Sequence, residues 1–208
     1  MVPELALTTF AEWLTSIFFS MDCAVLEAFH RFAQTAFGRF AAAFLNLITL
    51  TGWKGAFLIF VSIVLILFRK TRRTGLCTLL ALAIGAIFTN VIVKNAVARP
   101  RPYDFDSTLR MWWEYAGSHL ETDYSFPSGH MTAACGFTSG FMLTRGRKWL
   151  IPGIVYVFLM GISRMIIVVH YPSDVLGGIL FGVCAGVISY FIVAAIYRKW
   201  GQSKLLHE

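Results

Sequence analysis

Long apolar segments separated by short polar ones dominate this 208-residue chain. A helix needs about 20 mostly apolar residues to cross a bilayer, and fewer where its polar flanks reach the interface. Five segments fit this requirement and are predicted to be membrane-spanning helices: residues 55–68, 76–93, 131–144, 149–160 and 175–197. The pattern therefore predicts an all-α fold, a polytopic transmembrane helix bundle.

The first 50 residues mix polar side chains with apolar ones. Residues 5–21 are apolar except for Glu12, whose charge would be costly at the bilayer centre, and they form the candidate for a sixth span. Residues 22–37 combine charged side chains with Leu and Phe at helical spacing, which is typical of a helix lying in the interface. Residues 40–50 lead into the next span. Because no Lys or Arg precedes Arg31, we expect no cleavable signal peptide.

The composition excludes an ordinary soluble domain. The chain is 57% hydrophobic and 14% charged, with a mean hydropathy of +0.68, whereas soluble domains average about half apolar and about a quarter charged residues. The length fits one domain, residues 1–208. A net charge of +7 would suggest a nucleic-acid partner in a soluble protein, but here the positions of the basic residues decide their meaning.

Most basic residues fall in three clusters that lie on one side of the membrane if the spans alternate. These are Arg69, Lys70, Arg72, Arg73, Arg145, Arg147, Lys148, Arg198, Lys199 and Lys204. Short basic loops mark the cytoplasmic side. The opposite, outer side carries Lys94, Arg99, Arg101, Arg110 and Arg164. A positive cluster beside histidines on that side indicates an anionic partner other than nucleic acid.

Three polar islands on the outer side carry the candidate chemistry. Lys94 and Arg101 lie in the first island, and Arg164 lies in the third. Their ammonium and guanidinium groups suit phosphate oxygens. In the second island, Ser128 and Gly129 precede an apolar run. A small hydroxyl, a glycine and the N–H groups of a helix start would add donors for an anion.

The third island also pairs a histidine with a carboxylate. His170 and Asp174 are four residues apart, so one turn of helix, or a tight turn at Pro172, brings the carboxylate to the imidazole. A carboxylate in that place would orient the ring and stabilise its positive form. Histidine can act as a nucleophile in covalent catalysis, which leaves His130 as the general acid for the leaving oxygen.

Each island also has a structural interpretation. Lys94 and Arg101 could anchor the end of a span, and the Pro-Ser-Gly-His segment could be a turn and helix cap. His170 and Asp174 could be a structural hydrogen-bonded pair. Arg164, between apolar runs, needs a partner in any case. The occurrence of all three islands on one side favours catalysis.

The order and spacing of these residues form three motifs. They are Lys-x6-Arg-Pro from Lys94 to Pro102, Pro-Ser-Gly-His at residues 127–130, and Ser-Arg-x5-His-x3-Asp from Ser163 to Asp174. In these motifs, and over residues 46–197, the sequence resembles the type-2 phosphatidic acid phosphatase superfamily of integral membrane lipid phosphatases. Arg99 also precedes a proline, but the motif register favours Arg101.

The resemblance implies a hydrolase that needs no metal and no cofactor. His170 would attack phosphorus and form a phosphohistidine, with Asp174 orienting the ring. His130 would protonate the departing group and then help to activate water. The groups that would hold the phosphoryl oxygens are Lys94, Arg101, Ser128, the Gly129 backbone and Arg164.

Residues 103–125 are predicted to form a water-exposed loop between the first two islands. Trp112, Trp113 and Tyr115 suit an interfacial belt, although they could also cover the site or contact a lipid tail. His119 is expected at the surface. The acidic residues of the loop are Asp104, Asp106, Glu114, Glu121 and Asp123.

Two classes of function fit the sequence. The first is a phosphatase for a lipid phosphate or diphosphate in the cell membrane, with its site facing outward. Small chains of this shape resemble bacterial undecaprenyl diphosphate phosphatases, while phosphatidylglycerophosphate and phosphatidic acid phosphatases share the motifs. The second class is a lipid-phosphate transporter or binding scaffold without turnover. Two histidines with separate roles favour the enzyme.

Overall fold

The computed structural model describes residues 7–52 and 55–200, and within these ranges the ordered elements are all helices. The all-α prediction is therefore confirmed. Residues 5 and 6 of the candidate sixth span, and Lys204 of the basic clusters, lie outside the described ranges.

The described chain folds into a series of helices. In chain order, the helices are α1 (Thr9–Gln34), α2 (Ala36–Gly52), α3 (Ala56–Leu67), α4 (Arg72–Ala86), the π-helix η2 (Ile87–Val93), α5 (Lys94–Val97), α6 (Pro102–Phe105), α7 (Ser107–Tyr115), α8 (Gly129–Arg145), the 3-10 turn η3 (Arg147–Trp149), α9 (Leu150–Ile166) and α10 (Pro172–Trp200).

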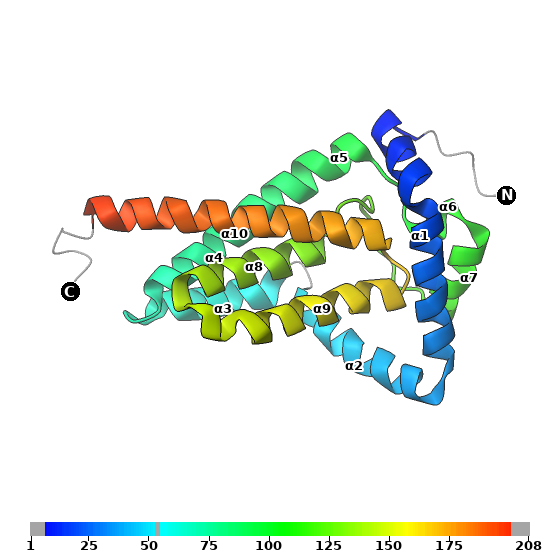
Figure 1. Ribbon diagram of the computed structural model, residues 1–208, viewed down its shortest axis with the longest axis horizontal. Helices are drawn as coiled ribbons and strands as arrows, with labels where there is room; N and C mark the ends of the chain where they lie inside the picture. Colours follow the sequence, from blue (N-terminus) through cyan, green and yellow to red (C-terminus); the bar gives the residue numbers. More distant parts are fainter. Residues whose placement is uncertain (1–6, 53–54, 201–208) are drawn as a thin grey trace.

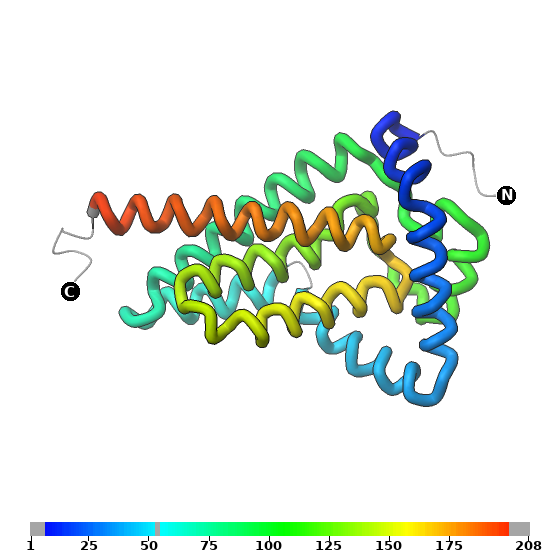
Figure 2. Tube along the Cα trace, in the orientation of Figure 1, coloured from blue at the N-terminus to red at the C-terminus, as the bar shows by residue number. Residues whose placement is uncertain are grey.

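Five helices form the body of the molecule. α3, α4, α8, α9 and α10 run lengthwise beside one another (Figure 1), and α8 packs against α4, α9 and α10. The tube in Figure 2 shows α4, η2 and α5 as one continuous helical run, and it shows the sharp reversal between α1 and α2.

Several helices have the length and composition of membrane spans. Thr9–Gln34, Arg72–Phe105, Arg147–Ile166 and Pro172–Lys199 meet both conditions, and α2 with α3 would make a fifth span. α8, predicted as a span over residues 131–144, has 17 residues, which is about 26 Å of helix at 1.5 Å per residue. Large apolar side chains such as Phe60, Phe158 and Phe191 point outward, as expected for a multi-pass membrane protein.

α8 and α10 approach each other closely because glycines line their contact. A Cβ at Gly178 would lie 2.7 Å from the carbonyl oxygen of Ser128, and one at Gly182 would lie 2.6 Å from that of Thr132. Small residues allow such packing between membrane helices, where dispersion contacts replace the hydrophobic effect. The close contact fixes the start of α8 beside the start of α10, and the Ser128 N–H donates to the Asp174 carbonyl at 3.1 Å.

The N-terminal segment differs from its prediction. The sequence predicts a span at residues 5–21 and a separate interfacial helix at residues 22–37, but α1 is continuous from Thr9 to Gln34. It runs across the end of the bundle instead of along it (Figure 1). The predicted boundary rests on the change from an apolar segment to one with several charged side chains, which suits an interface. Asp22, the first of these charged residues, is instead fully buried against donors from Arg99 and Ser173.

The basic clusters gather at the end of the bundle away from α1. The α3–α4 turn, the α8–α9 turn and the C-terminal end of α10 all lie there (Figure 1). Arg145 donates to the carbonyl of Lys70 at 3.3 Å, and the guanidinium of Arg73 lies 5.9 Å from the ring centre of Tyr197. The three polar islands therefore share the other end.

Candidate active site

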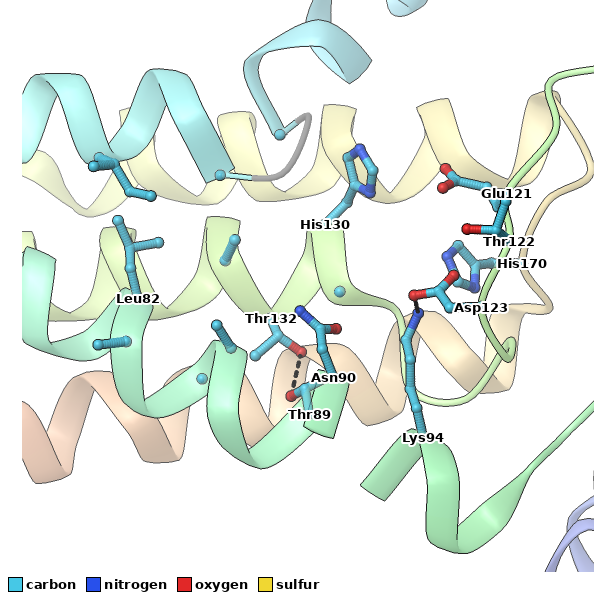
Figure 3. Close-up of a pocket in the computed structure, with 18 of the residues that line it drawn as sticks. Leu82, Thr89, Asn90, Lys94, Glu121, Thr122, Asp123, His130, Thr132 and His170 are labelled. Carbon is cyan, nitrogen blue, oxygen red and sulfur yellow. Dashed lines mark hydrogen bonds and ion pairs between the residues drawn. The ribbon is translucent and has the colours of Figure 1, made fainter. Parts of the chain in front are cut away.

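The three polar islands meet in one cavity of about 440 Å³. Five of the eight predicted site residues line it: Lys94, Arg101, Gly129, His130 and His170. Figure 3 shows Lys94 of α5, His130 of α8 and His170 of the connection between α9 and α10 around it. Of the other three, Asp174 and Arg164 lie directly behind these groups. The Ser128 hydroxyl is fully buried and has no hydrogen-bond partner within the described part of the chain.

A π-helical segment carries one wall of the cavity. η2 ends immediately before Lys94, and π-turns often occur at functional sites. Thr89 of η2 donates to Thr132 of α8 at 3.2 Å, a bond drawn in Figure 3. A Cβ at Gly129 would lie 2.9 Å from Asn90 Oδ1. The Asn90 side chain therefore lies directly against Gly129, and Asn90 joins the lining of the cavity without having been singled out in the sequence.

His170 presents its two ring nitrogens to different surroundings. Nδ1 lies 3.6 Å from Asp174 Oδ2, whereas Nε2 lies 3.5 Å from Arg101 Nη1. Proline is favoured at the first position of a helix, and α10 begins at Pro172, so the turn keeps the histidine and the carboxylate adjacent. Nε2 is therefore the nitrogen that faces the cations.

The His170 ring is held in its neutral form. Its side chain is only 1% exposed. Burial lowers the pKa of His170 well below its ordinary value, and the positive charges of Arg101 and Arg164 lower it further. A neutral imidazole has a lone pair available for attack.

Asp174 is fixed by donors from three sides. Its Oδ2 accepts from Ser125 Oγ at 2.5 Å and from the Tyr171 N–H at 2.9 Å. Its Oδ1 accepts from Arg99 Nη1 at 2.6 Å. Ser125 Oγ also lies 3.5 Å from His170 Nδ1. Ser125 and Arg99 therefore belong to the surroundings of His170 and Asp174, a place that the sequence does not predict for them.

Arg99 and Arg101 turn in opposite directions. Arg101 lines the cavity and donates to the Val169 carbonyl at 2.7 Å. Arg99 turns away, pairs with Asp22 at 2.9 Å and stacks over Tyr171 at 4.0 Å from the ring centre. The motif register, which favours Arg101 as the phosphate ligand, agrees with this arrangement.

The two cations that line the cavity and Arg164 behind it are all paired with carboxylates. Asp123 accepts from Lys94 Nζ at 2.6 Å and from Arg101 Nη2 at 2.5 Å, and Glu121 pairs with Arg164. Both carboxylates belong to the segment between α7 and α8. From the sequence they are expected only as charges of a water-exposed loop, and the signal that could have found them is their proximity to the Pro-Ser-Gly-His segment.

Asp123 stays ionised in this position. Partial burial alone would raise the pKa of Asp123, but the charges and hydrogen bonds of Lys94 and Arg101 outweigh it and lower the pKa to about 2. Carboxylate and phosphate oxygens are both strong acceptors for ammonium and guanidinium groups. The cations are therefore already arranged around anionic oxygens.

His130 completes the polar part of the cavity. It lies in the first turn of α8, and its Nε2 is 3.5 Å from Arg164 Nη1. The cavity then continues between α3 and α4, away from the charges, where Leu82 marks the apolar end in Figure 3. The apolar lining consists of Ile59, Leu79, Leu82, Ala83 and Ala86. One cavity thus joins an anion site to an apolar channel.

Residues 74–198 match the model of the PAP2 superfamily. An undecaprenyl-diphosphatase from Sulfolobus acidocaldarius is 32% identical over 122 residues, 59% of this chain and 56% of that protein. A lipid A 1-phosphatase from Rhizobium etli is 33% identical over 142 residues, 64% of this chain and 58% of that protein. A phosphatidylglycerophosphatase B from Bacillus subtilis is 32% identical over 143 residues, 64% and 62% of the two chains. The matches thus span 56% to 62% of these relatives' lengths.

Two solved structures share the fold. The first transmembrane PAP2 type phosphatidylglycerolphosphate phosphatase from Bacillus subtilis has a TM-score of 0.67, with 26% identity and 91% of each chain covered. Aquifex aeolicus LpxE has a TM-score of 0.60, with 23% identity, and the match covers 81% of this chain and 94% of that one.

Proposed function

Because this chain belongs to the PAP2 superfamily, as its three motifs predict, we propose that it is a membrane lipid phosphatase that works through a phosphohistidine at His170. The observation that carries the mechanism is the position of the His170 ring. Its Nδ1 faces a fixed carboxylate and its Nε2 faces the cations. A binding site alone needs the cations, but it has no need for an oriented neutral imidazole.

The chemistry runs in two displacements. His170 Nε2 attacks phosphorus, and the bond from phosphorus to the lipid or diphosphate oxygen breaks. His130, protonated when the anionic substrate is bound, gives its proton to the leaving oxygen. Asp174 stabilises the positive ring that forms. Water, deprotonated by His130, then cleaves the phosphorus–nitrogen bond and releases phosphate and neutral His170.

The phosphoryl oxygens take the place that loop carboxylates occupy. Lys94 and Arg101 exchange Asp123 for phosphate, and Arg164 exchanges Glu121. Charge develops on these oxygens in the transition state, so preorganised donors stabilise it more than the ground state. The Gly129 backbone and Ser128 supply further donors at the start of α8.

A lipid substrate is supported by the apolar half of the cavity. The channel between α3 and α4 can take the first carbons of a chain, while the headgroup meets the cations. We infer undecaprenyl diphosphate as the substrate, in line with the name of the relative from Sulfolobus acidocaldarius. Phosphatidylglycerophosphate and phosphatidic acid are the alternatives within the same chemistry.

The site is proposed to face outward from the cell membrane. Basic loops favour the cytoplasmic side, and the basic clusters of this chain lie at the bundle end opposite the cavity. A cysteine introduced at Ser118, on the cavity side, is expected to react with a membrane-impermeant thiol reagent in intact cells. A lack of labelling there, with labelling in inside-out vesicles, would reverse the orientation.

Phosphate release from detergent-solubilised protein tests the function. The substrate panel contains undecaprenyl diphosphate, phosphatidylglycerophosphate and phosphatidic acid. His170→Ala is expected to abolish release, while His119→Ala, a histidine of the exposed segment after α7, leaves it unchanged. EDTA should not inhibit, because no step uses a metal. Turnover retained in His170→Ala would refute the mechanism, and tight lipid binding without any release would indicate a carrier instead.

A further inference from the structure

A buried carboxylate of α1 reaches the surroundings of the nucleophile. Asp22 is 0% exposed and accepts three hydrogen bonds. Ser173 donates its N–H at 2.9 Å and its hydroxyl at 2.6 Å, and Arg99 donates Nη2 at 2.9 Å. α1 lies outside the range matched by the family model, residues 74–198. Asp22 is therefore tied to the motif region although it lies far from it in sequence.

Arg99 connects Asp22 to Asp174. Its Nη1 donates to Asp174 Oδ1 at 2.6 Å and to Ser173 Oγ at 2.8 Å. The guanidinium also stacks on Tyr171 at 4.0 Å, a favourable contact for a desolvated cation. One guanidinium thus bridges two carboxylates, and none of the three groups reaches water.

The charges of this network explain why two carboxylates are needed. If Arg99 faced Asp174 alone, the pair would be neutral and would do little for a positive imidazole. Asp22 supplies a second negative charge, so the network as a whole is negative behind Nδ1 of His170. The same bonds fix the Asp174 side chain, because its Oδ1 is committed to Arg99.

We propose that Asp22 and Arg99 are positioning residues for the nucleophile, acting through Asp174. They hold the Asp174 carboxylate beside His170 and keep its negative charge available when the imidazole becomes positive. The inference rests on the proposed phosphohistidine mechanism. It extends the catalytic machinery to α1, so the helix that crosses the end of the bundle supports the reaction as well as the fold.

The test compares Asp22→Asn with Glu27→Gln. Both substitutions neutralise a carboxylate of α1, but Glu27 forms an exposed pair with Arg31 at 2.6 Å. Lipid substrate with a labelled terminal phosphate is mixed with the solubilised protein, and label on the protein is followed after alkaline quenching. The amplitude of labelling counts the molecules that are folded and active, whereas the rate constant reports the attack by His170.

For Asp22→Asn we expect the rate constant of labelling to fall about 10- to 100-fold, by analogy with the loss that follows when the hydrogen-bond partner behind a metal-binding side chain is removed. KM should stay within about twofold, because the phosphate-binding cations are untouched. Glu27→Gln should match the wild type. Arg99→Met should lower the same rate constant, and adding Asp22→Asn to it should cause little further loss, because Asp22 acts through Arg99.

The outcomes distinguish a failure of this inference from a failure of the proposed phosphohistidine mechanism. If His170→Ala still releases phosphate, the mechanism itself is wrong. If His170→Ala is inactive but Asp22→Asn loses only labelling amplitude, with an unchanged rate constant, Asp22 merely holds α1 in place and the inference is wrong. Should Asp22→Asn not fold, Ser173→Ala removes a hydroxyl shared by Asp22 and Arg99 and leaves both charges. Its rate constant should then fall severalfold, and an unchanged value would overturn the inference.

Discussion

His170 lies between two sets of ion pairs that differ in their access to water. Behind the ring, Arg99 pairs with Asp22 and Asp174, and all three side chains are at most 1% exposed. In front of the ring the cations are buried, but the side chains of their partners are 49% exposed for Asp123 and 31% exposed for Glu121. Only the front carboxylates can return to water when the pair opens.

This difference assigns the two sets to different tasks. Removing one partner of a buried pair costs about 3–5 kcal/mol, because a charge is left without compensation. An ion pair exposed on both sides is worth about 0–1 kcal/mol, and the front pairs, with a buried cation and a partly exposed carboxylate, lie between these two limits. In the proposed mechanism, the rear set is therefore a permanent support for His170. The front set is the proposed anion site, in which a phosphoryl group replaces the carboxylates.

The largest expected effect comes from the rear set. Asp174→Asn keeps the shape but removes the charge that stabilises the imidazolium, so kcat should fall about 1,000- to 10,000-fold. KM should change little. Steady-state phosphate release measures both constants, with Asp104→Asn, in the exposed pair with Arg110, as the control. A loss of less than tenfold would mean that the rear set is structural only.

The next effect comes from a cation of the front set. Arg101→Met should lower kcat/KM about 100- to 1,000-fold, because it removes a preorganised donor to the phosphoryl oxygens. Arg101→Lys should recover only part of this loss, since an ammonium cannot span both Asp123 and the Val169 carbonyl as the guanidinium does. Arg110→Met, on the exposed surface, serves as the control. Full activity in Arg101→Met would place the anion elsewhere.

A smaller effect of opposite sign is expected from the exchangeable carboxylate. Asp123→Asn removes the competitor of the phosphate, so KM should fall about three- to tenfold, the factor that corresponds to roughly 1 kcal/mol. The value of kcat should be nearly unchanged. Substrate titrations of the variant and the wild type measure the ratio. A higher KM in Asp123→Asn would show that this carboxylate helps to bind the substrate.

The smallest effect is a pH dependence of stability. Because the pKa of Asp123 is lowered to about 2 from its ordinary value of 3.8, its ion pairs stabilise the fold fully above about pH 4. This contribution is lost as the pH falls towards 2. The Tm difference between wild type and Asp123→Asn should therefore be constant from pH 5 to pH 8 and shrink below pH 4. A difference that disappears near neutral pH would contradict this assignment.

The sequence anticipates the parts of the molecule that are encoded locally. Apolar runs predict the helices, and the motif spacing predicts which residues meet, because each motif lies at a helix end on one side of the bundle. Lys94, Arg101, His130 and His170 converge as expected. This convergence is predictable because, in a chain whose spans alternate in direction, every second connection lies at the same end of the bundle.

The residues whose roles the sequence does not predict contact partners that are far away along the chain. Asp22 and Ser173 are 151 positions apart, and no local pattern links them. The change to charged residues that begins at Asp22 suggests a helix boundary, because the pairing of Asp22 with distant donors is invisible in the sequence. Asp123 and Glu121 resemble ordinary loop charges for a similar reason. Only the fold reveals that they meet the cations.

The most direct test of the central claim is to identify the phosphorylated residue. The wild-type protein, given lipid substrate with a labelled terminal phosphate and quenched in alkali, should carry label on the peptide that contains His170. That label should be stable in base and lost in acid, as for a phosphorus–nitrogen bond, and it should be absent from His170→Ala. Label on another residue, or full turnover without any labelled intermediate, would contradict the mechanism.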